Sequence, residues 1–182
     1  MAGLIFTLDI ATRTGWAKGR SGEAPTSGVK DLKTSGEVSN LGKMGNNLCA
    51  FLLKEWDKDL PMILVVEQLM KLGGFAMNAN SEANVKMQIS LHMAARMAAD
   101  VAGVRFAEAH ASTVSKHFIG KGNLKRAEKK PLFVKRCQLL RYMGSEDYDD
   151  NQADALAVWD YATAHYSGKI PTELHLFGEV KK

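Results

Sequence analysis

The chain has 182 residues, of which 46% are hydrophobic and 24% are charged, a composition that predicts one globular domain with a sizeable core. The formal net charge of +4 and the pI near 9.0 favour an anionic partner. Cys49 and Cys137 lie far apart without CxxC spacing, which argues against a disulfide framework and predicts buried free thiols. Neither a membrane-spanning apolar run nor a signal-peptide pattern is found, so we expect no membrane association and a cytoplasmic protein.

The first predicted element is a buried strand at residues 4–10, a near-continuous apolar run that includes Asp9 near its end. Open α/β sheets place their sites at the carboxyl ends of strands, so Asp9 is a candidate site residue. The alternative is an aspartate that caps the following turn. A second extended segment begins at Trp16, and residues 19–38 predict a hairpin of short, edge-like strands.

A second strand that ends in an acid is predicted at residues 62–67, after an amphipathic helix at residues 41–56. Its last residue is Glu67. If the two strands are parallel neighbours, Asp9 and Glu67 converge at one edge of the sheet. Like charges at that distance repel and raise a pKa unless a cation lies between them.

The middle of the chain contains a glycine-rich loop with Phe75 and then a long helix that starts near Ser81. Phe75 either folds back on the core or acts as a wedge that stacks on nucleic-acid bases. His92 is expected on another face of the helix, as a weak ligand candidate. The helix is expected to bury one apolar stripe in the core, formed by Val85, Ile89, Met93, Met97 and Val101.

A half-buried strand is predicted at residues 104–109, followed by a helix capped by Ser112 or Thr113. The window 116–136 then holds eight Lys or Arg residues and one acid, with glycines at its centre. Such a window is either a solvated charged loop or a phosphate-binding surface. We expect Pro131 to start the next helix. The candidate DNA contacts in the loop are Lys116, Lys121, Lys125 and Arg126.

The last predicted helix runs to about Tyr166, with Asp149 and Asp150 at positions where Asp commonly caps a helix. Asp154 interrupts a run of small apolar residues in this helix. A buried carboxylate is costly unless something compensates its charge, and a divalent metal is the usual compensator. Asp150 or Asn151 shares one helical face with Asp154. Residues 1–166 are expected to form the domain and residues 167–182 a C-terminal extension.

The candidate ligands are therefore all oxygen donors: Asp9, Glu67 and Asp154, with Asn151 or Asp150 as a fourth. Oxygen-only clusters favour Mg²⁺ or Mn²⁺, and no Cys/His set indicates zinc. Two such ions would activate a water and stabilise the leaving oxygen of a phosphodiester. Acids for a metal beside a basic segment for a polyanion are typical of a nuclease.

The order of these motifs resembles the RuvC family of Holliday junction resolvases, the crossover junction endodeoxyribonucleases, and most of all its phage and bacterial members. The resemblance spans residues from about 4 to 166. It rests on a strand-borne Asp (Leu8-Asp9-Ile10 with Gly15), a strand-borne Glu (Val66-Glu67-Gln68), a lysine-rich glycine loop and a helix-borne Asp (Ala153-Asp154-Ala155-Leu156-Ala157). Two further landmarks are Asn78-Ala79-Asn80-Ser81 and Phe118-Ile119-Gly120-Lys121-Gly122.

The resemblance implies an RNase H-like α/β fold, with a mixed five-stranded sheet flanked by helices. It also implies a homodimer that nicks a four-way DNA junction symmetrically with Mg²⁺, for which Mn²⁺ would substitute. Asp9 and Asp154 would then hold the metal and Glu67 would bridge or orient the ions. Lys129 or Lys130 would contact the scissile phosphate.

The chain departs from the family pattern at two functional positions. Asn151 stands where the family usually has an acid or His, and Met70 stands where a wedge aromatic is common, which leaves Phe75 as the nearest aromatic. Nuclease activity on other branched DNA or on structured RNA is therefore an alternative. A non-catalytic DNA-junction-binding module is another, although the complete set of acids argues against it. An actin-like phosphotransferase would need a second glycine-rich phosphate loop and a longer chain.

Overall fold

The computed structural model describes residues 3–33, 40–56, 58, 61–69 and 79–167. Its elements follow the predicted order of strands and helices. They are β1 (Leu4–Asp9), β2 (Arg13–Arg20), β3 (Thr26–Asp31), α1 (Leu41–Trp56), β4 (Ile63–Glu67), α2 (Ala79–Ala102), β5 (Arg105–Ala109), α3 (Ala111–Ile119), α4 (Arg126–Leu139) and α5 (Asp150–Tyr166). No helix in these ranges is both long and apolar enough to cross a membrane.

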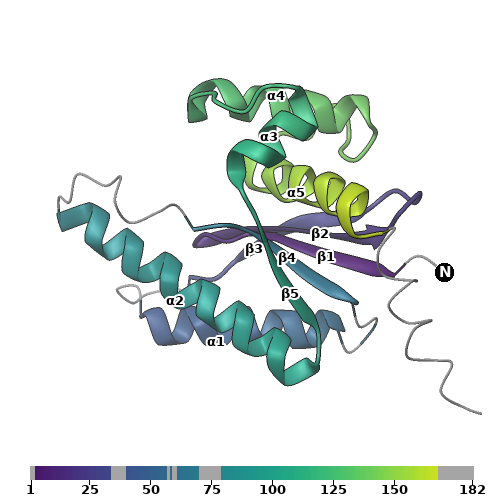
Figure 1. Cartoon of the computed structure of the whole chain (residues 1–182). Coiled ribbons are helices and arrows are strands. Elements are labelled where there is room, and N and C mark those ends of the chain that lie inside the picture. The colour runs from purple at the N-terminus through teal and green to yellow at the C-terminus, as the bar shows by residue number, and fades with distance from the viewer. Residues whose placement is uncertain (1–2, 34–39, 57, 59–60, 70–78, 168–182) are drawn as a thin grey trace, which may run out of the picture.

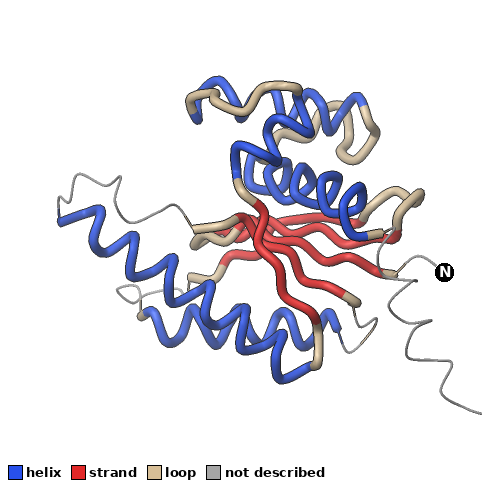
Figure 2. Tube along the Cα trace, viewed as in Figure 1, coloured by secondary structure: helices blue, strands red, loops and turns tan. Residues whose placement is uncertain are grey.

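The strands form one mixed five-stranded sheet in the order β3-β2-β1-β4-β5. The β1, β4 and β5 strands are parallel, whereas β2 pairs antiparallel with both β1 and β3. The α1 and α2 helices cover one face, while α5 covers the other with α3 and α4 stacked outside it (Figures 1 and 2). The predicted mixed sheet flanked by helices is confirmed.

The central strands β1 and β4 are nearly continuous apolar runs, which suits a sheet with helices on both faces. Successive side chains of β1 point to opposite faces, so Ile5 joins the core under α5 and Phe6 joins the core under α1 and α2. Ile63 and Leu64 of β4 divide in the same way. A hairpin is formed by β2 and β3, but it begins at Arg13, before the predicted range 19–38. Of its two strands only β3 is an edge strand, because β2 also pairs with β1.

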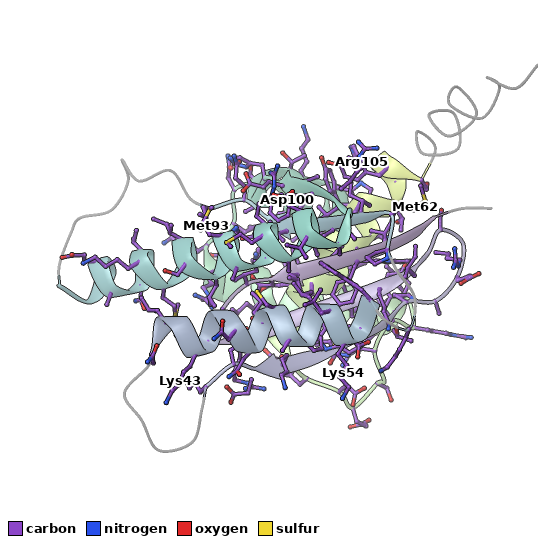
Figure 3. All side chains as sticks on the ribbon, turned by 90° about the horizontal axis from the view of Figure 1, so that it is seen from below. Lys43, Lys54, Met62, Met93, Asp100 and Arg105 are labelled. Atoms are coloured by element: carbon purple, nitrogen blue, oxygen red, sulfur yellow. The ribbon has the colours of Figure 1, made fainter. Side chains whose placement is uncertain are left out.

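The predicted buried face of α2 is wrong. The buried face of α2 is formed instead by Leu91, His92, Ala95, Ala98 and Ala99, and His92 is only 8% exposed. The two apolar stripes have the same helical period, and the small alanines allow the closer packing of α2 against α1 and the sheet. Figure 3 shows α1 and α2 side by side on this face, with Met93 labelled on α2. Val85 is half-buried, and the exposed stripe comprises Ile89, Met93, Met97 and Val101.

Two predicted helix starts are also corrected. The α3 helix is capped by His110, whose Nδ1 accepts a hydrogen bond from the Ser112 backbone, and neither Ser112 nor Thr113 is the cap. The α4 helix begins at Arg126 and contains Pro131, which was expected at its start. Lys129 and Lys130 therefore lie in a helix rather than in the loop. Phe75, Met70 and the extension from residue 168 onwards lie outside the described residues.

Candidate active site

Asp9 and Glu67 are the last residues of two adjacent parallel strands. In the β1–β4 pairing Leu8 lies opposite Val66, so the acid that follows each residue lies at the same edge of the sheet. The sequence-based expectation that the two strands are parallel neighbours is confirmed. The carboxyl ends of these parallel strands form the edge at which sites occur in open α/β sheets.

Asp154 reaches the same edge from α5, which packs on β1 and β2. The Thr7 hydroxyl of β1 donates a 2.9 Å hydrogen bond to the carbonyl of Ala155. Asp149 caps the helix by accepting hydrogen bonds from the backbone N–H groups of Asn151 and Gln152, which confirms the predicted helix start. Asp154 is 7% exposed, so its carboxylate is buried in the apolar run as the sequence indicated.

The pKa values of Asp9 and Glu67 are raised by burial and by neighbouring negative charges. Burial, the charge of Asp154 and the charge of Glu67 together raise the pKa of Asp9 to about 7. Burial also raises the pKa of Glu67, with a further contribution from Asp154 and an opposing one from Lys129. The carboxylates are therefore close enough to repel, which is the electrostatic environment that a cation stabilises.

Lys129 of α4 is inserted among these acids. Its Nζ lies 3.2 Å from Asp154 Oδ1 and 3.9 Å from Glu67 Oε2, and 4.8 Å from the centroid of the Phe133 ring. Burial alone would lower the pKa of Lys129, but Asp154, Glu67 and Asp9 outweigh it and raise the pKa. Lys129 is therefore a charged counter-ion of the carboxylate cluster.

Lys130, the next residue, forms an ion pair with Asp150 in the first turn of α5. Burial and the neighbouring positive charges of Arg126 and Lys129 lower the pKa of Lys130. Consecutive lysines of one helix thus contact two candidate ligand residues of the other. The Asn151 side chain is half-buried in the same turn.

The donor set fits a hard divalent cation, although the side chains do not form a ready cage. In the described ranges, no group of three or more His, Cys, Asp or Glu side chains is arranged to hold a metal ion. Lys129 lies between the acids that would have to converge. Apart from that ion pair, the buried Asp154 Oδ1 has no hydrogen-bond partner in the described part of the chain. A buried carboxylate oxygen whose partner is a lysine ammonium, beside two further carboxylates, suits Mg²⁺ or Mn²⁺.

One candidate DNA contact, Arg126 at the start of α4, acts on this cluster. Its positive charge opposes the rise in the pKa of both Asp9 and Glu67. Exposed basic residues continue over α3 and the segment that leads into α4, namely Lys116, Lys121 and Lys125.

Two residues of the site, His110 and Arg13, were missed from the sequence, and Gly15 was noted there only as a family landmark without a structural role. His110 follows β5, the neighbour of β4, and a positive charge on its ring would oppose the rise in the pKa of Glu67. Arg13 forms a 2.9 Å ion pair with the helix cap Asp149. Gly15 lies opposite Asp9 in β2, at the point where α5 comes closest. Position directly after a strand was a usable signal for His110, whereas the roles of Arg13 and Gly15 depend on long-range packing.

Comparison with known proteins identifies solved structures of this fold. The structure of RuvC from Thermus thermophilus is 18% identical, with a TM-score of 0.63 over 88% of this chain and 96% of that chain. The T. thermophilus RuvC structure in complex with a Holliday junction substrate gives the same identity and TM-score over 89% and 96%. The yeast mitochondrial Holliday junction resolvase Ydc2 is 12% identical, with a TM-score of 0.55 over 92% of this chain and 83% of that one.

No family model and no curated protein matches the sequence. The likeness is therefore one of structure, and it covers nearly the whole chain. It confirms the expected RNase H-like architecture and shows that the structural neighbours are those to which the sequence motifs had pointed. The chain has the fold of the RuvC Holliday junction resolvases.

Proposed function

We propose that this protein is a metal-dependent endonuclease that resolves four-way DNA junctions by symmetric phosphodiester hydrolysis. The observation that carries the proposal is the convergence of Asp9, Glu67 and Asp154 at one edge of the sheet. There, burial and the charges of Asp154 and Glu67 raise the pKa of Asp9. The fold supports the substrate class, because a RuvC structure that shares it holds a Holliday junction substrate. The free cysteines fit a cytoplasmic location.

In this proposal Asp9, Glu67 and Asp154 hold Mg²⁺, for which Mn²⁺ substitutes, and Asn151 supplies a fourth oxygen. Asp150 is the alternative fourth ligand. The bound ions would supply Lewis-acid chemistry, by activating the attacking water and stabilising the leaving oxygen. The protein provides the oxygen donors, fixes them on two strands and one helix, and keeps Asp154 away from bulk water.

The positive residues beside the acids are proposed to bind the DNA backbone. Lys129 and Lys130 would contact the scissile phosphate, because they belong to the helix that faces the carboxylates. Charge contacts of this kind position a nucleic acid without reading its sequence. The outer contacts would come from Lys116, Lys121, Lys125 and Arg126, and Phe75 is the proposed base-stacking residue.

The exposed stripe of α2 supports a homodimer. Met93, Met97 and Val101 are 54%, 61% and 81% exposed. With Ile89 they form an apolar line of about 18 Å along one helix. Large exposed apolar patches mark interaction sites. A two-fold axis through the stripe would pair it with itself in a second copy, as cyclic dimers do. Two copies are also what symmetric nicking of two strands requires.

A cleavage assay with three nucleic acids tests this function. A synthetic mobile four-way junction, a linear duplex and a structured RNA are each incubated with and without Mg²⁺, together with Asp9→Asn. We expect paired nicks on the junction alone, which disappear without metal and in the variant. Preference for the RNA would support the alternative substrate. Junction binding without cleavage in Mg²⁺ or Mn²⁺ would instead identify a non-catalytic binding module.

A second pair of variants identifies the fourth ligand. Asn151→Ala should reduce cleavage more than Asp150→Ala, because Asp150 already has a partner in Lys130. If only Asp150→Ala loses activity, Asp150 rather than Asn151 completes the site.

A further inference from the structure

Two consecutive lysines of α4 neutralise carboxylates that the proposed function assigns to the metal. Lys129 contacts Asp154 and Glu67, and Lys130 contacts Asp150. We infer that Lys129 is an internal counter-ion that a divalent ion must displace, so that metal binding and DNA binding are coupled through α4. The inference rests on the metal site of the proposed function. It adds that Lys129 must leave the carboxylates when the metal binds, and that Lys129 therefore controls the affinity for the metal.

The ammonium of Lys129 and a metal ion cannot share the site. Mg²⁺ binds carboxylate oxygens at about 2.0–2.1 Å, and Ca²⁺-sized ions at about 2.3–2.6 Å. An ion in contact with both Asp154 and Glu67 would therefore lie in the space where the Lys129 Nζ now lies, 3.2 Å and 3.9 Å from their oxygens. Two like charges at that separation repel strongly in a water-poor site. Binding of the ion thus requires Lys129 to leave.

The displaced ammonium needs another anion, and a phosphate of the nucleic acid is the one that binding brings. Lys129 is a half-buried residue near the amino end of α4, and its ammonium lies 4.8 Å from the centroid of the Phe133 ring. Lys125 and Arg126 at the start of the same helix are exposed. An anionic backbone drawn to these residues lies near Lys129 and offers it a replacement for the carboxylates. Binding of DNA therefore lowers the cost of vacating the site.

Coupling of this kind is reciprocal. If DNA raises the affinity for the ion by releasing Lys129, the ion raises the affinity for DNA by the same factor. The free protein should then bind the ion weakly, and the catalytic centre should assemble mainly on DNA. The pairing of Lys130 with Asp150 extends the same competition to the second candidate fourth ligand.

Titration of the full-length protein with Mn²⁺, without DNA, tests the inference by calorimetry. Lys129→Met should bind Mn²⁺ about 10-fold more tightly than the wild type, whereas Lys129→Arg, which keeps the charge, should resemble the wild type. Lys135→Met is the matched control, because Lys135 is exposed on the same helix. Asp154→Asn, which removes a proposed ligand, should bind less tightly than any of them.

If Lys129→Met binds no more tightly than the wild type while Asp154→Asn loses Mn²⁺, the counter-ion inference is overturned and the metal site stands. If none of the proteins binds Mn²⁺, both are overturned. The fold of Lys129→Met is followed by thermal denaturation. In EDTA its unfolding midpoint should be lower than that of the wild type. On addition of Mn²⁺ its midpoint should rise by more than the midpoint of the wild type does. A midpoint unaffected by Mn²⁺ in this variant would also contradict the inference.

Coupling to DNA is measured as the change in Mn²⁺ affinity on addition of a short linear duplex. The same titration with Asp154→Asn measures the Mn²⁺ bound by the duplex itself, and that amount is subtracted. The duplex should increase the Mn²⁺ affinity of the wild type and have little effect on Lys129→Met. An equal increase in both proteins would show that DNA acts on the ion without Lys129.

Discussion

The carbonyl oxygen of Asn151 occupies the position where a Cβ on Gly15 would stand. Gly15 pairs with Asp9 in the β1–β2 register, and Asn151 lies in the first turn of α5. The missing side chain therefore allows the helix that carries Asp154 to rest directly on the strand beside Asp9. The contact brings the first turn of this helix against the strand that pairs with Asp9.

Gly15→Ala should separate the two halves of the site. The added methyl group must push the first turn of α5 outward, and overpacking of this kind costs about 1–3 kcal/mol of stability. Because the displaced turn carries Asn151 and leads to Asp154, we expect junction cleavage to fall about 10-fold or more even at a temperature at which the variant remains folded. Chemical denaturation and single-turnover cleavage measure the two effects separately.

Gly45→Ala is the control for this substitution. A Cβ at Gly45, inside α1, would meet its nearest heavy atom, the Ala94 Cβ, at 3.6 Å, an ordinary contact. Replacing a mid-helix glycine should stabilise the protein by about 0.5–1 kcal/mol and leave cleavage unchanged. Equal activity of Gly15→Ala and Gly45→Ala would show that the close approach of α5 is not needed for catalysis.

Asp149 has two roles that substitution can separate. Its carboxylate caps α5 and forms the ion pair with Arg13, which is 57% exposed at its side chain. Asp149→Ala should cost about 1 kcal/mol because the cap is lost. Asp149→Asn keeps a capping oxygen and should cost only a few tenths of a kcal/mol, since an exposed ion pair contributes little. Urea denaturation distinguishes the two. Equal losses in both variants would mean that the ion pair, and not the cap, holds the start of the helix.

Stability at acidic pH should depend on His92. Burial lowers the pKa of His92 to about 4 from its ordinary value of 6.5, and its Nδ1 has no hydrogen-bond partner in the described ranges. The unfolded chain therefore takes up this proton more readily than the folded chain as the pH falls below 6.5. The free energy of unfolding should decrease between pH 6.5 and about pH 4, by up to about 3 kcal/mol from this group.

His92→Leu removes that contribution, so its free energy of unfolding should fall less steeply over the same pH range than that of the wild type. Leu53→Met, which changes an exposed residue without a titratable group, should keep the wild-type slope. Identical slopes for His92→Leu and the wild type, measured by urea denaturation at pH 4.5 and 7, would contradict a neutral buried His92.

The dimer should depend on the stripe of α2. Met97→Glu places a charge in the middle of an apolar surface, so it should shift the protein from dimer to monomer in light scattering without loss of helix content. Leu139→Glu changes a residue of α4 that is 68% exposed and should leave the dimer intact. A wild-type protein that is monomeric at tens of micromolar would rule out this interface.

The acid cluster was predictable because its signals are local. An apolar run that ends in an acid, as at Asp9 and Glu67, indicates both a central strand and the end at which a site can form. Asp154 stood out because alanines surround it in the sequence, and it is indeed buried. The parallel pairing that joins the strands was stated as a condition, and the structure confirms it.

What could not be predicted depends on packing between distant segments. On α2 two stripes of equal period compete, and contact with α1 favours the alanines over residues such as Met93. At α4 a proline, common at helix starts, placed the expected start at Pro131, five residues beyond Arg126. That error hid the helical position of Lys129, and therefore its contact with Asp154.

The central claim is that Asp154 belongs to a catalytic metal site, and its most direct test is the single-turnover rate of junction cleavage in Mg²⁺. Asp154→Asn changes one oxygen to an amide nitrogen and should lower the rate at least about 100-fold. Asp160→Asn, on the same helix but bonded to His117 and Tyr142, should stay within about threefold of the wild type. A wild-type rate in Asp154→Asn, with intact folding, would contradict the account.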